Sequence, residues 1–161
     1  MKKKALIIVL IIIVLGIGLF ILAECRKQND LEKTLLAGHS WGETPNESKT
    51  IGMTDTLFEY KVYFTSKTTH SEDNELNKIY YCIKENKDNQ NVTKADYDNL
   101  VNKFSTLIGK NGEVETKDEL TFNRWYDGSI KYELEFRDES KVKNPASDNN
   151  IIYITISNDK Y

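Results

Sequence analysis

The sequence predicts an α+β protein, with an N-terminal transmembrane helix followed by one antiparallel sheet of about five strands. A short and a long helix are expected to pack on one face of this sheet. Three observations predict this class. Residues 5–23 form an uncharged run, several later segments alternate apolar and polar side chains as strands do, and residues 97–108 repeat apolar side chains every three or four positions.

The first element, Ala5 to Ala23, has the length and composition of a membrane span. Fifteen of its 19 residues are Leu, Ile, Val or Phe, and a helix of this length is about 28 Å long, close to the ~30 Å hydrocarbon core. The lysines at 2–4 favour a cytoplasmic N-terminus. Two alternatives stay open. One is a cleaved signal peptide, and the other is a lipid on Cys25, although Glu24 stands where a lipoprotein signal has a small residue.

This reading divides the chain into four parts. Residues 1–4 are a basic cytoplasmic tip, 5–23 a transmembrane helix, 24–40 a juxtamembrane stalk with a short helix, and 41–161 an extracytoplasmic domain. The expected location is therefore the cell membrane, crossed once. Beyond the span, 22 − 3 = 19 Lys and Arg stand against 25 Asp and Glu, a formal charge of −6. This acidic balance argues against nucleic-acid binding. The abundance of Ile, Lys and Asn is typical of a bacterium with an AT-rich genome.

Two helices are predicted within the domain. Thr44, Pro45 and Glu47 form a capping box with a proline in the first turn, and the short helix that they begin is expected to end at Gly52. The long helix is expected to begin after Thr93 and to end at Gly109, because the apolar stripe lies between these two capping residues.

The expected strands are the segments 57–64, 77–85 and 151–158 and the two arms of a hairpin over residues 119–136. In that hairpin, Asp127 and Gly128 provide the two-residue turn. The alternation after the turn is that of an antiparallel strand with one solvated face. Burying both the strand pattern and the helix pattern requires helices over one face of a single sheet.

The stretch "WGETPNESKTIG", the tyrosine-rich strands and the helix ending "LIGK" resemble the helix-on-sheet group of the β-lactamase inhibitor protein and the outer-membrane assembly lipoproteins. The shared feature is a Gly-x-Thr-x-x-Glu opening, here Gly42, Thr44 and Glu47. The resemblance implies a protein-binding domain without catalytic residues. The long helix between the second and third strands departs from this layout, so no partner is transferred.

No pattern of a catalytic or metal site is found in the sequence. His39 and His70 lack the spacing of metal ligands, and no nucleophile elbow, phosphate loop or dinucleotide fingerprint is present. We expect no cofactor and no metal. Trp41, Arg124 and Tyr126 are the candidate binding-surface residues, with core packing and a cation over an aromatic ring as their structural alternatives.

The expected function is therefore a membrane-anchored, non-catalytic interaction domain. Its expected partner, besides the membrane, is an envelope protein, a peptide or a glycan. The alternative is a small envelope hydrolase whose carboxylates and histidine meet only in the folded chain.

Overall fold

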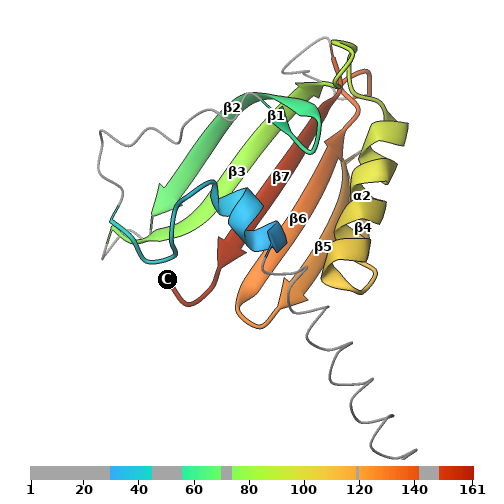
Figure 1. Ribbon diagram of the computed structural model, residues 1–161. Helices are drawn as coiled ribbons and strands as arrows, with labels where there is room; N and C mark the ends of the chain where they lie inside the picture. The colour runs from blue at the N-terminus through green and yellow to red at the C-terminus, as the bar shows by residue number, and fades with distance from the viewer. Residues whose placement is uncertain (1–29, 45–55, 70–73, 119, 142–148) are drawn as a thin grey trace, which may run out of the picture.

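The computed structural model describes residues 30–44, 56–69, 74–118, 120–141 and 149–161. These residues form one antiparallel sheet with helices over one of its faces (Figure 1). The strands are Thr56–Leu57 (β1), Tyr60–Thr69 (β2), Leu76–Glu85 (β3), Glu113–Lys117 (β4), Leu120–Asp127 (β5), Ile130–Arg137 (β6) and Ile151–Asn158 (β7). Their order is β1-β2-β3-β7-β6-β5-β4. The last strand, β7, thus joins the two halves of the sheet at its centre.

The prediction of about five strands is wrong, because the sheet has seven. Both additional strands are at the edges. β1 is only two residues long, and every residue of β4 is exposed. β1 is too short to show an alternation, and β4 has no buried face, so neither has the pattern of apolar and polar side chains that identifies a strand in a sequence.

The segment 57–64, expected as one strand, is divided by a tight turn. Phe58 and Glu59 have φ angles of 52° and 73°, and Leu57 pairs with Tyr60 across them. Two successive positive φ angles are typical of a type I′ turn, in which Asn, Asp and Gly are the usual residues. Because Phe58 and Glu59 are not among these residue types, the sequence contains no sign of this turn.

The hairpin of β5 and β6 is confirmed, but its turn lies one residue later than expected. Asp127 pairs with Ile130, which leaves Gly128 and Ser129 as the two-residue loop. Gly128 has a φ of 59°, as a type II′ turn requires of its first central residue.

The long helix is confirmed as α2, Lys94–Ile108. The Thr93 side chain accepts a hydrogen bond from the backbone N–H of Asp96, and the Asp96 carboxylate accepts one from the backbone N–H of Thr93, which completes a capping box. Gly109 ends the helix with a φ of 79°. The apolar stripe of α2 is buried on the sheet through Tyr97, Leu100, Phe104 and Ile108.

A second helix, over residues 30–36, covers the sheet beside α2 (Figure 1). The expected juxtamembrane stalk includes this segment, but Leu31, Leu35 and Leu36 belong to the hydrophobic core. The hydroxyl of Tyr81 on β3 donates a hydrogen bond to the Leu35 carbonyl at 2.5 Å. This helix is therefore an integral part of the folded domain. The helix expected between Thr44 and Gly52 lies almost wholly outside the described residues.

Within the described ranges, no helix combines the length and the apolar composition that a membrane crossing requires. This finding corrects the expectation of a single-pass, membrane-anchored protein with a cytoplasmic N-terminus. The expected span, Ala5 to Ala23, lies outside the described residues. So does Cys25, on which one of the two alternatives places a lipid.

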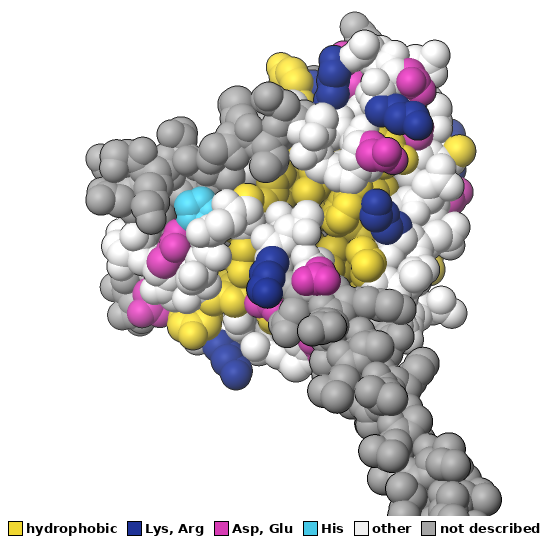
Figure 2. All heavy atoms as spheres, in the orientation of Figure 1, with side chains coloured by type: hydrophobic (Ala, Val, Ile, Leu, Met, Phe, Trp, Pro, Cys, Tyr) yellow, Lys and Arg dark blue, Asp and Glu magenta, His cyan; other side chains and the backbone are white. Residues whose placement is uncertain are grey.

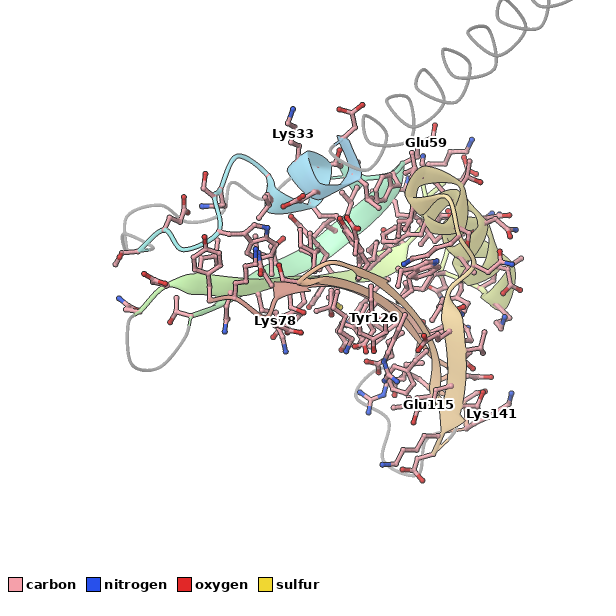
Figure 3. The ribbon with its side chains drawn as sticks, turned by 90° about the horizontal axis from the view of Figure 1, so that it is seen from below. Lys33, Glu59, Lys78, Glu115, Tyr126 and Lys141 are labelled. Carbon is pink, nitrogen blue, oxygen red and sulfur yellow. The ribbon has the colours of Figure 1, made fainter. Side chains whose placement is uncertain are left out.

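The sheet is bent, and its two faces therefore differ in shape (Figure 3). Figure 3 shows the sheet curving away from the helices toward β5 and β4, so that the face without helices lies on the inside of the curve. In the same view Tyr126 lies on this inner side, whereas Lys33 points outward from the helix over residues 30–36.

Candidate functional site

The candidate site is the face of the sheet that no described helix covers, which we call the helix-free face. Period-two alternation assigns its residues, because the neighbours of each on the same strand point into the core. On β3, for example, Ile79, Tyr81 and Ile83 are buried under the helices, so Tyr80 and Cys82 point the other way.

Two rows of side chains cross this face through the register of five strands. The first row is Tyr80, Thr155, Glu133, Arg124 and Glu113. The second row is Cys82, Tyr153, Glu135, Phe122 and Glu115. The first row ends in three charged side chains, whereas aromatic and charged side chains alternate along the second row from Tyr153 onward, and most residues of both rows are half-buried.

Arg124 is the centre of a charge network on this face. Its Nε donates to Glu133 Oε2 at 2.5 Å, and its Nη1 donates to Glu115 Oε2. Lys131 Nζ lies 2.9 Å from the same Glu133 oxygen. The guanidinium also lies 4.9 Å from the centroid of the Phe122 ring, within the range of a cation–π contact. The side chain is thus held in one orientation by partners on three strands.

The network changes the ionisation of its members. Burial alone would raise the pKa of Glu133, but the hydrogen bonds from Arg124 and Lys131 outweigh burial and lower it. The bonds to Glu133 and Glu115 raise the pKa of the Arg124 guanidinium. Arg124 and Glu133 are therefore both charged at neutral pH.

The second row has the opposite character. Burial raises the pKa of Glu135, and the nearby Arg137 offsets this effect only in part. Burial also raises the pKa of the Cys82 thiol, which has a relative exposure of 1%. Because the thiolate is the reactive form, Cys82 is a packing residue.

The three candidate residues from the sequence separate in the structure. Arg124 and Tyr126 lie on the helix-free face, where Tyr126 is 44% exposed. Trp41 does not join them. Its indole N–H donates to Glu32 Oε1 at 2.7 Å, and its ring packs against the core on the helix-covered side. Trp41 therefore packs on the core, which was the structural alternative to a binding role.

Sequence reasoning missed the partners of Arg124. The alternation in residues 130–137 places Glu133 and Lys131 on an outward face, but nothing in it relates them to Arg124. The hairpin provides the missing signal, because its register sets Glu133 directly opposite Arg124. Glu115 could not be found, because β4 itself was not predicted.

The structure describes one of the two histidines, His39. His39 contacts Glu43 in the segment after the first helix, where Glu43 also bonds to Leu76 at the start of β3. His70 lies outside the described residues. Among the residues that the structure describes, no group of three or more His, Cys, Asp or Glu is arranged to hold a metal ion.

No protein-family model, no curated protein and no solved structure matches this chain.

Proposed function

We propose that this chain is a non-catalytic binding domain that recognises a protein or peptide partner through its helix-free face. The observation that carries the proposal is the one-sided cover of the sheet: helices bury one face, whereas the other presents half-buried aromatic and charged side chains in ordered rows. Arg and Tyr are among the residue types enriched at protein interfaces and at their hot spots.

The fixed orientation of the Arg124 side chain also supports binding. A side chain that is already fixed loses little conformational entropy when a partner arrives. Arg124, which is 24% exposed and held by Glu133 and Glu115, is such a side chain. Tyr126, the neighbouring exposed aromatic residue on the same face, offers apolar area beside it.

A protein surface fits this face better than a small molecule does. The rows extend over five strands, and specific protein interfaces are broad, burying about 800 Å² on each partner. The face carries charges of both signs, with Arg124 and Lys131 beside Glu133 and Glu115, so a partner with its own charges of both signs gains complementarity.

Site-specific photocrosslinking tests the proposal with a matched pair of positions. Glu113 and Val114 are adjacent, exposed residues of β4 whose side chains point to opposite faces. A photoreactive amino acid at Glu113 or Tyr126 is expected to crosslink one defined partner in cells, whereas the same amino acid at Val114 is not. Equal crosslinking from both faces, or crosslinking from Val114 alone, contradicts the proposal.

Affinity measurements with the crosslinked partner provide the second arm. Arg124→Ala is expected to weaken binding at least tenfold, which corresponds to about 1.4 kcal/mol. Lys33→Ala on the helix-covered side is expected to leave the affinity unchanged. An unchanged affinity of the Arg124→Ala protein would show that the helix-free face is not the binding surface.

A further inference from the structure

A second feature lies on the opposite side of the molecule from the helix-free face. It is a cavity of about 300 Å³ where three segments meet: the β1–β2 turn, the segment that follows β3, and α2. Its volume is at the lower end of the range of small-ligand pockets, about 300–1,000 Å³. Figure 2 shows hydrophobic side chains between α2 and the β1–β2 hairpin, with basic and acidic side chains beside them.

The apolar part of the lining is an aromatic ring fixed by its neighbours. Phe58 packs edge-on against Phe104 of α2, with ring centroids 5.6 Å apart and an interplanar angle of 72°. Lys103 Nζ lies 4.9 Å from the centroid of the Phe58 ring. These contacts hold Phe58 in the left-handed conformation that a bulky residue rarely adopts. Phe58 and Leu100 thus give the cavity a fixed apolar surface.

The polar part of the lining contains both donors and acceptors. The Tyr60 hydroxyl lies 3.5 Å from the Asp96 carbonyl oxygen, and burial, followed by the charge of Asp96, raises the pKa of this phenol. The hydroxyl therefore stays protonated at neutral pH. The Asp96 carboxylate is fixed in place because its Oδ2 accepts hydrogen bonds from Thr93 N–H at 2.8 Å and Thr93 Oγ1 at 2.7 Å.

The charges around the cavity nearly cancel. Two lysines, Lys87 and Lys103, stand against three carboxylates, those of Glu59, Asp88 and Asp96. None of the five forms an ion pair with another described residue. Because positive and negative groups are nearly equal in number, neither a phosphate nor a polycation is favoured. This balance favours a neutral ligand that can pair with ammonium, carboxylate, amide and phenol groups at once.

We propose that this cavity binds a sugar unit of a neutral oligosaccharide. Each sugar hydroxyl is both a donor and an acceptor, so a polyol satisfies a lining that mixes Lys103 and Asn99 with Asp96. The apolar face of a pyranose ring packs on the Phe58 side. This site is separate from the helix-free face and does not depend on the function proposed for that face.

Binding of defined probes to the full-length protein tests this site. Cellotriose, maltotriose and tri-N-acetylchitotriose are titrated by saturation-transfer NMR and calorimetry, with inorganic phosphate as an anionic probe. At least one trisaccharide is expected to bind with a Kd below about 1 mM, and phosphate is not expected to bind. Failure of all three sugars at ten times that concentration, or binding of phosphate in their place, overturns the proposal.

Substitutions then locate the site. Asn99→Ala is expected to weaken sugar binding at least tenfold, because Asn99 lines the cavity from the exposed surface of α2. Tyr60→Phe removes a single hydroxyl and is expected to weaken binding severalfold without altering the fold. The control is Tyr63→Ala, an exposed aromatic residue beside Lys84 of the helix-free face. Weaker binding in the control, with the cavity variants unchanged, assigns the sugar to the other face and refutes the proposal.

Discussion

A buried polar contact between α2 and the sheet provides a sharp test of how the two layers are joined. Asn123 on β5 is 5% exposed, and its Nδ2 donates to the Tyr97 hydroxyl of α2 at 2.8 Å. The same hydroxyl lies 3.3 Å from the Thr121 carbonyl oxygen and 3.4 Å from that of Leu134. Burial raises the pKa of Tyr97 to about 12. The phenol is therefore neutral and can donate to a carbonyl while it accepts from Asn123.

The two partners are expected to respond differently to substitution. Tyr97→Phe leaves the Asn123 amide buried without this partner, which costs about 1–3 kcal/mol of the free energy of unfolding. Asn123→Leu removes one hydrogen bond but leaves the Tyr97 hydroxyl two carbonyls to donate to, so the cost is about 1 kcal/mol. In the double variant no amide is left unpaired. Its cost is expected to fall below the sum of the two single costs by about 1 kcal/mol.

Urea unfolding followed by tryptophan fluorescence measures these differences. Trp125 is 1% exposed, so its emission reports exposure of the core, and an unchanged m-value shows that the unfolded states remain comparable. The reasoning is refuted if the two substitutions are additive within about 0.5 kcal/mol. It also fails if Asn123→Leu costs more than Tyr97→Phe.

Two further predictions concern the sheet. Gly112→Ala is expected to cost about 1–3 kcal/mol of the free energy of unfolding, because the added Cβ would lie 2.7 Å from Cε2 of the buried Trp125 ring. Gly128→Ala has no atom within 4 Å of the added Cβ but a φ of +59°, so backbone strain alone is expected to cost about 1–2 kcal/mol. Urea unfolding of the two variants compares these costs. The pKa of Glu133 is lowered in the folded protein, so its contribution to stability is fully present above its unfolded pKa and is lost as the pH falls through the folded value. Arg124→Gln is expected to make the loss of stability in this acid range shallower in thermal unfolding from pH 7 to 3, and an identical pH profile for both proteins would contradict this.

The elements that the sequence determined by itself are those specified by neighbouring residues. The caps of α2 are an example, because Thr93, Asp96 and Gly109 act on backbone groups within one helical turn. The β5–β6 hairpin is another, and its turn was misplaced by a single residue. In such elements the interacting groups are close along the chain, so their geometry follows from composition and order.

The face that each strand buries was decided by tertiary structure. On β5, Leu120 and Phe122 lie on the same side as Arg124, and apolar alternation alone would favour burying that side. The structure instead buries Asn123 and Trp125, because this side of β5 meets α2 and the other has no helix over it. The candidate site shows the same limit: Arg124 was identifiable, but its carboxylate partners were not.

Tertiary structure also determined the edges of the sheet and the place of the first helix. β1 and β4 exist because a neighbouring strand offers hydrogen bonds, not because their own side chains form a buried stripe. The helix over residues 30–36 is short, and its leucines are stabilised by burial beside Tyr81. Local sequence specifies how backbone groups are satisfied nearby, whereas burial depends on surfaces brought together from distant parts of the chain.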